Sequence, residues 1–154
     1  MAKLIRVVPD TNIIISGMLG NQGFPRKLLN LSLAKKVVLY GSQETFEEFC
    51  EKVRLPRLQK FLTRQMYSSE KIILDYKSII KIVEPFDLLD GEAIANNDRD
   101  DDIFFRIAKA CGAKIIVSGD KKHVLAVKEY DGIVTVPVSK FIEKFQNLES
   151  SKLY

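Results

Sequence analysis

Acidic side chains follow two short apolar stretches of the 154-residue sequence. Asp10 comes directly after Ile-Arg-Val-Val-Pro, and Asp120 comes directly after Ile-Ile-Val-Ser-Gly. A dense acidic run, Asp98-Arg-Asp-Asp-Asp102, precedes the second stretch. Carboxylates that converge on one point repel one another, and a divalent cation relieves that repulsion. Because oxygen ligands favour Mg²⁺ or Mn²⁺ over zinc, the pattern indicates a site for one of these ions.

Strands and helices are predicted to alternate along most of the chain. The hydrophobic pattern predicts short strands at 5–9, 37–40, 82–84, 114–117 and 133–136. It predicts a helix that begins near Pro25 and further helices at 43–53, 57–66, 68–80, 102–112, 121–127 and 140–146, with Ser42 and Ser139 as N-caps. This alternation favours a parallel sheet with helices on both faces, and 57–66 and 68–80 form an extra helical pair.

The position of a site follows from this fold class. In doubly wound sheets, ligands bind at the carboxyl ends of the strands, where the strand order reverses. If strands 5–9 and 114–117 are neighbours there, Asp10 and Asp120 converge, and the Asp100–Asp102 run supplies a third carboxylate. Each residue alone could also have a purely structural role. Asp10 and Asp120 suit helix caps or turns, and the acidic run suits the positive end of a helix dipole.

Composition limits the alternatives. Apolar residues make up 46% of the chain and charged residues 29%, which is typical of one folded domain rather than a disordered segment. No apolar run approaches the ~20 residues of a membrane span, so we expect a cytoplasmic protein with no membrane partner. A single histidine excludes a two-histidine acid–base ribonuclease. The net charge of +4 is compatible with a polyanionic partner.

Four motifs in order resemble those of the PIN-domain family, and the resemblance runs from Val7 to about Phe141. The branch that the chain resembles is the VapC-like one, described as the toxin components of toxin–antitoxin pairs. The motifs are Val-Pro-Asp10-Thr11-Asn12, Ser42-x-Glu-x-Phe-x-Glu48-Phe, Asp98-x-Asp-Asp101-Asp and Val117-Ser118-Gly119-Asp120-Lys121. Arg99, Pro9 and Ser118 depart from the usual family residues, and none of these departures removes a carboxylate.

The resemblance implies a three-layer α/β/α fold with a five-stranded parallel sheet of order 3-2-1-4-5. A single nuclease domain would span 1–146, followed by a polar tail at 147–154. The implied catalytic and metal-binding quartet is Asp10, Glu48, Asp101 and Asp120, with Thr11, Asn12, Ser118 and Asp102 as supporting groups. Mg²⁺ or Mn²⁺ would activate water for attack on an RNA phosphodiester. An antitoxin is the implied protein partner.

Glu48 depends on the resemblance alone. A helical wheel of 43–53 places it with Glu44, Glu47 and Glu51, nearly opposite Phe46 and Phe49. Periodicity therefore predicts that all four glutamates belong to a solvated face. Only the family motif selects Glu48 from this set.

Basic and apolar residues outside the quartet suggest surfaces for partners. Two groups of basic residues could hold RNA phosphates, with a solvated surface as the alternative: Arg57, Lys60 and Arg64, and Lys121 and Lys122. On the extra helical pair, Ile72, Tyr76 and Ile79 could form a homodimer or antitoxin contact, with the protein's own core as the alternative.

Two other functions compete with the ribonuclease. One is a non-catalytic RNA-binding module of the same fold, which the intact quartet disfavours. The other is an aspartate-dependent phosphatase, which needs a second acid two positions after the first, where this chain has Asn12. A nucleotide-cofactor fold is disfavoured, since no G-x-G-x-x-G follows the first strand.

Overall fold

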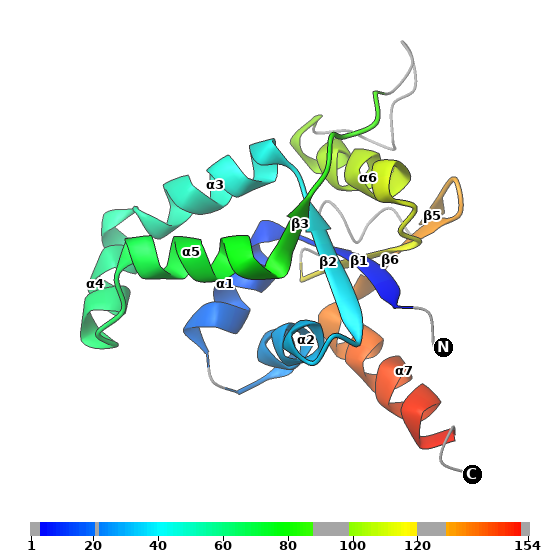
Figure 1. Cartoon of the computed structure of the whole chain (residues 1–154), viewed down its shortest axis with the longest axis horizontal. Helices are drawn as coiled ribbons and strands as arrows, with labels where there is room; N and C mark the ends of the chain where they lie inside the picture. Colours follow the sequence, from blue (N-terminus) through cyan, green and yellow to red (C-terminus); the bar gives the residue numbers. More distant parts are fainter. Residues whose placement is uncertain (1–3, 21, 88–98, 120–128, 152–154) are drawn as a thin grey trace.

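A sheet of short hydrophobic strands forms the centre of the fold (Figure 1). The computed structural model describes residues 4–20, 22–87, 99–119 and 129–151. Within them the strands are β1 (Ile5–Pro9), β2 (Val37–Gly41), β3 (Ile80–Ile82), β4 (Ile115–Ser118), β5 (Glu129–Tyr130) and β6 (Ile133–Pro137). Their order is β3-β2-β1-β4-β6-β5, and the first five are parallel.

The predicted strand order is confirmed for the five parallel strands, and the predicted number of strands is wrong by one. The additional strand, β5, pairs antiparallel with β6 at the edge of the sheet. Asp131 and Gly132 connect them with φ angles of 53° and 80°. Two positive φ angles in an Asp-Gly pair are typical of a tight hairpin turn, so this signal was present in the sequence.

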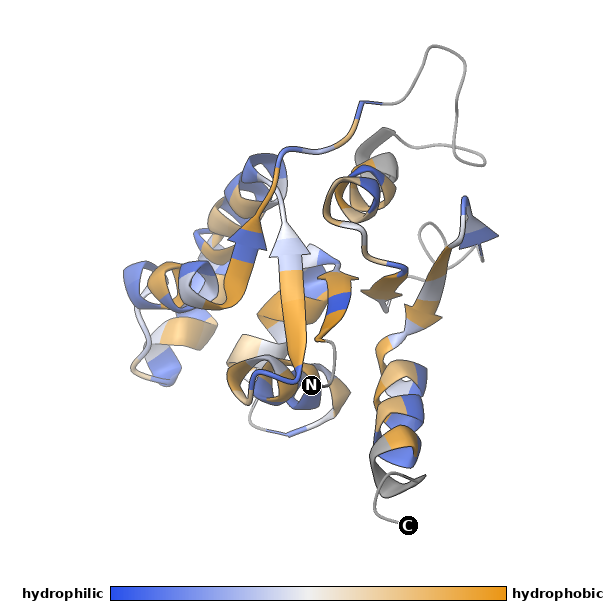
Figure 2. Ribbon diagram, turned by 45° about the vertical axis from the view of Figure 1, so that its right-hand side comes forward, coloured by the Kyte–Doolittle hydropathy of each residue, from blue (hydrophilic) through white to orange (hydrophobic). Residues whose placement is uncertain are grey.

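Helices cover both faces of the sheet, as the α/β prediction requires. They are α1 (Thr11–Leu19), α2 (Phe24–Leu33), α3 (Gln43–Val53), α4 (Pro56–Arg64), α5 (Ser69–Ile79), α6 (Arg99–Cys111) and α7 (Val138–Ser151). One face packs Val7, Leu39 and Val117 against apolar residues of α1, α2, α3, α5 and α7. The other face packs Val8 and Ile116 against α6. In Figure 2, the strands are mainly orange and the helices carry both orange and blue residues, as expected for helices between core and solvent.

Several predicted boundaries differ from the structure. The third strand was predicted at 82–84, but β3 begins at Ile80, whose backbone pairs with Leu39 and whose side chain is buried. The last helix begins at Val138, so Ser139 is its second residue and not its cap, and it continues to Ser151 instead of ending at 146. The helix predicted at 121–127 lies outside the described residues.

The extra helical pair belongs mainly to the protein's own core. Ile72 and Tyr76 of α5 are buried, and Tyr76 stacks on Phe49 of α3 with ring centroids 4.1 Å apart. Neither residue is therefore available as a docking surface, which leaves only the half-buried Ile79 of the three suggested residues. The stacked rings of Phe49 and Tyr76 fix the position of α3, because neighbouring elements enclose both rings.

Among the described residues, no helix has both the length and the apolar character needed to cross a membrane.

Phe49→Ala should lower the free energy of unfolding by about 3–5 kcal/mol, because it removes a fully buried ring from the contact between α3 and α5. Urea unfolding followed by circular dichroism measures the loss. Leu74→Ala is the matched control on α5, since Leu74 is 63% exposed, and it should change the value by less than about 0.5 kcal/mol. Equal losses in both variants would contradict the assigned core.

Candidate active site at the carboxyl ends of β1 and β4

Asp10 lies at the end of β1 and caps the N-terminus of α1. Its side chain is buried, and Oδ1 accepts a hydrogen bond of 2.8 Å from the backbone N–H of Ile13. The alternative interpretation of Asp10, as a helix cap, is therefore confirmed, and it does not exclude a second role for the side chain. Capping uses one carboxylate oxygen and leaves the second for another role.

The second oxygen of Asp10 meets Ser118 at the end of β4. The buried Ser118 hydroxyl donates to Asp10 Oδ2, across 108 positions of sequence. The two strands are parallel neighbours, with Pro9 opposite Val117, and the Asp10 N–H donates to the Val117 carbonyl at 3.0 Å. The expectation that strands 5–9 and 114–117 are adjacent is confirmed, and Ser118 lies where a supporting group was predicted.

Glu48 approaches the same edge of the sheet from α3. The Thr11 hydroxyl donates to Glu48 Oε2 at 3.5 Å, and Thr11 is the residue after Asp10. Glu44, Glu47 and Glu51 of the same helix are exposed, whereas Glu48 is half-buried. The four glutamates are therefore not equivalent, although the helical wheel placed them on one solvated face.

Lys52 was not predicted as part of this region. Its Nζ lies 2.9 Å from Glu48 Oε1 and donates to Asn12 Oδ1 at 3.0 Å. The spacing of four residues between Glu48 and Lys52 is the one sequence signal for this pair, because such residues face each other on a helix. The Lys52 ammonium therefore contacts both Glu48 and Asn12, which was predicted as a supporting group.

Buried contacts set the orientation of α3 and hence of Glu48. Ser42 caps the helix, since its hydroxyl accepts from Thr45 N and the Thr45 hydroxyl accepts from Ser42 N. Behind them, burial raises the pKa of Tyr76 well above its usual range, and the neighbouring charge of Glu48 raises it further. Tyr76 therefore stays a neutral phenol at physiological pH.

Of the other predicted site residues, those of the acidic run and of the segment after β4 fall at or beyond the limits of the described region. The backbone of Asp101 and Asp102 lies in the first turn of α6, as the acidic run suggested. Their side chains, and all of Asp120, Lys121 and Lys122, lie outside the described residues. Arg57, Lys60 and Arg64 are exposed on α4.

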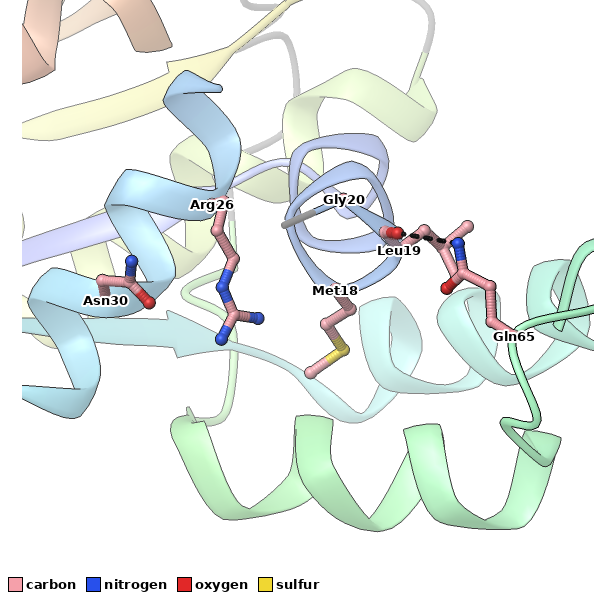
Figure 3. A pocket seen from close by; sticks show the side chains of 6 residues that line it. All are labelled: Met18, Leu19, Gly20, Arg26, Asn30 and Gln65. Carbon is pink, nitrogen blue, oxygen red and sulfur yellow. Dashed lines mark hydrogen bonds between the residues drawn. The ribbon is translucent and has the colours of Figure 1, made fainter. Parts of the chain in front are cut away.

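A cavity of about 580 Å³ lies at the opposite end of α1 from Asp10 (Figure 3). Its lining residues are Met18, Leu19, Gly20, Arg26, Asn30 and Gln65, and a hydrogen bond joins Gln65 Nε2 to the Leu19 carbonyl. Leu19 is the ninth residue after Asp10, and nine residues of helix span about 13 Å. This cavity is therefore separate from the edge of the sheet that carries Asp10 and Ser118.

The donor atoms around Asp10 suit a hard divalent cation. Carboxylates of Asp10 and Glu48, hydroxyls of Thr11 and Ser118 and the amide oxygen of Asn12 offer oxygen ligands alone. Such sets favour Mg²⁺ or Mn²⁺. The Lys52 ammonium between two of these oxygens shows that the region accommodates positive charge. Among the described residues there is no cluster of three potential metal ligands, and two of the predicted four lie outside them.

Comparison with known proteins agrees with this fold. Residues 6–122 match the PIN domain family, and the chain belongs to it. It is also 31% identical over 153 residues to uncharacterized protein MJ1680 of Methanocaldococcus jannaschii, a match that covers 95% of each chain. PIN domains are generally nucleases, and they typically use divalent metals.

Asp10→Asn should leave the free energy of unfolding within about 0.5 kcal/mol of wild type, because an amide oxygen can still accept from Ile13 N. Asp10→Ala should lower it by about 1–2 kcal/mol, since it removes the cap and the acceptor of the buried Ser118 hydroxyl. Urea unfolding of the metal-free protein compares the two. If Asn destabilises as much as Ala, the cap is not what the Asp10 side chain contributes.

Proposed function

We propose that the chain is a metal-dependent endoribonuclease that hydrolyses RNA phosphodiester bonds at the carboxyl ends of β1 and β4. The observation that carries this proposal is the fixed Asp10 carboxylate with Glu48 beside it through Thr11, in a member of a family of nucleases. The two acids come from different elements, and Asp10 lies where a doubly wound sheet binds its ligands, with Glu48 in contact with the next residue, Thr11.

Each residue has a defined part in this proposal. Asp10 and Glu48 would hold the cation together with Asp101 and Asp120. Thr11, Asn12, Ser118 and Asp102 would orient these acids by hydrogen bonds, as Ser118 and Thr11 do for Asp10 and Glu48. When bound, Mg²⁺ or Mn²⁺ supplies charge that offsets the phosphate and makes water a better nucleophile. No side chain of the site has to attack the phosphate itself.

Lys52 would leave its contact with Glu48 when the cation binds. In the metal-free protein, its ammonium neutralises Glu48 and contacts Asn12. A half-exposed ion pair of this kind contributes little to stability, so exchanging it for a divalent ion costs little. The same side chain can then turn toward an RNA phosphate, which is the ordinary partner of a lysine in a nuclease.

The narrower parts of the proposal rest on the sequence. The four ordered motifs from Asp10 to Lys121 support a toxin role in a toxin–antitoxin pair, with an antitoxin as partner. The grouping of basic residues supports phosphate contacts by Arg57, Lys60, Arg64, Lys121 and Lys122. A second copy of the chain as partner was suggested by the apolar residues of the extra helical pair, and a cytoplasmic location by the composition.

Asp10→Asn and Glu48→Gln should each lower the rate of Mn²⁺-dependent cleavage of a fluorescent RNA by about 10²- to 10³-fold, because each removes charge from the cation site. Glu51→Gln is the matched control, since Glu51 is exposed on the same helix, and it should cleave at the wild-type rate. Chelator should abolish wild-type activity. A folded wild-type protein that binds RNA and does not cut it would favour the non-catalytic module instead.

Lys52→Gln should strengthen Mn²⁺ binding by up to about fivefold, because the lysine competes with the cation for Glu48. Glu48→Gln should weaken it by at least about tenfold. Isothermal titration without RNA measures both constants. Lys71→Gln is the control, because Lys71 pairs with Asp75 on α5 at the same spacing and should leave Mn²⁺ binding unchanged. Weaker binding in Lys52→Gln would contradict the competition.

A further inference from the structure

A second polar region lies on the face of the sheet that carries α6. It extends from Arg6 and Lys114, at the amino ends of β1 and β4, to Tyr40 and Lys81 on β2 and β3. Contacts of α6 with the sheet involve Val8, Tyr40 and Ile116. Next to this helix, the structure has a groove of about 800 Å³. Its lining residues are Leu4, Ile5, Arg6, Val38, Tyr40, Lys81, Gly112, Lys114 and Ile115. In Figure 2, α6 lies beside the arrowhead end of β2, so the opposite end of the strand extends beyond the helix.

The groove is cationic. Arg6, Lys81 and Lys114 are exposed along it, and no Asp or Glu is among the described residues that line it. They come from two strands, β1 and β3, and from the residue before β4. Val7 is opposite Ile115, so Arg6 and Lys114 each precede a paired residue on adjacent strands, about 5 Å apart. Like charges on neighbouring strands destabilise a sheet, and a bound polyanion relieves this cost.

One of these cations is held in place by the fold. Arg6 Nη1 donates to the Cys111 carbonyl at 2.6 Å, at the end of α6. The contact needs Gly112, whose φ of +76° ends the helix and whose bare Cα leaves room, since a Cβ there would lie 3.1 Å from Arg6 Nη1. One nitrogen of the guanidinium is thereby anchored, which leaves its other N–H groups to face the groove.

An aromatic ring lies among the cations. Tyr40 lines the groove, is half-buried, and is the cross-strand partner of Lys81. Cations that follow a groove together with an aromatic side chain form the usual surface for single-stranded nucleic acid, in which phosphates meet the charges and a base stacks on the ring. An acidic protein segment would use the charges but has no comparable use for the ring.

We propose that this groove is an RNA-binding exosite, which holds single-stranded RNA by phosphate contacts to Arg6, Lys81 and Lys114 with a base against Tyr40. It rests on the proposed ribonuclease function for its choice of RNA. The Arg6 end of the exosite is separate from the cleavage site, since Arg6 precedes Asp10 by four residues of strand, about 13 Å, and α6 covers the sheet between them. Tyr40 and Lys81 lie on β2 and β3, on the other side of β1 from β4. It would retain a substrate while another part of the same RNA reaches Asp10.

The test measures binding of a fluorescent single-stranded RNA by anisotropy in EDTA, where metal-dependent cleavage is off. Lys81→Ala/Lys114→Ala should weaken binding about tenfold at about 0.15 M salt and reduce the salt slope by about 1.4, as expected for two lost phosphate contacts. Lys77→Ala/Lys144→Ala is the charge-matched control, with two exposed lysines of α5 and α7, and should stay within about twofold of wild type. Equal affinities of the two double variants would overturn the exosite.

A second measurement uses the wild-type protein and needs no substitution. Bound RNA should protect Lys81 and Lys114 from acetylation, read by mass spectrometry, and leave Lys77 and Lys144 reactive. Modification of all four at unchanged rates would also overturn the proposal. Both assays report binding alone, so a failed cleavage assay with an intact exosite, or the reverse, separates this inference from the proposed nuclease activity.

Discussion

The position of the Asp10 carboxylate is the constraint around which the rest of the site is arranged. Its backbone N–H continues the pairing of β1 with β4 through Val117, one oxygen caps α1 through Ile13, and the other accepts from Ser118. Three elements therefore meet at a single buried side chain. A carboxylate restrained at both oxygens has few rotamers left, so it needs little reorganisation when a cation binds. The parallel neighbours β1 and β4 make this possible, since only adjacent strands bring their carboxyl ends within hydrogen-bonding distance.

Packing on the buried side of α3 brings Glu48 to Thr11, the residue after Asp10. Phe49, the next residue, is fully buried and stacks on Tyr76 of α5, and the Ser42–Thr45 capping box fixes the start of α3. These contacts fix the rotation of α3 about its own axis, and that rotation turns Glu48 toward Thr11. The helices α4 and α5, which interrupt the alternation of strands and helices, are thus part of what positions the site. The buried contact of Phe49 with Tyr76 therefore determines the position of the charged Glu48.

Sequence alone could predict the elements of the site that follow from local rules, and it failed where the outcome depends on contacts between distant elements. Asp10 and Asp120 were predicted from strand ends and a fold rule, Ser118 was predicted from the family motif, and the five parallel strands follow from the alternating pattern. Glu48 could not be selected by periodicity, because a helical wheel records the angle of a residue and not whether α1 lies opposite it. Lys52 was missed for the same reason, since its contact with Asn12 spans 40 positions. The start of β3 was misplaced because Ile79 and Ile80 suit the apolar face of a helix and a buried strand equally.

Two acidic and two basic residues lie at opposite ends of the strands β1 and β4. Asp10 and Glu48 lie at the carboxyl end, while Arg6 and Lys114 lie toward the amino end. An acidic edge alone repels a polyanion, so a nuclease of this design needs positive charge from another source, either bound cations or basic side chains. Basic residues placed directly beside the acids would pair with them, as Lys52 does with Glu48, and would compete with the proposed metal. Under the proposed function, Arg6 and Lys114 would avoid that competition, because they would attract RNA through the long-range field without neutralising the carboxylates. The net charge of +4 is therefore compatible with an acidic site at Asp10 and Glu48.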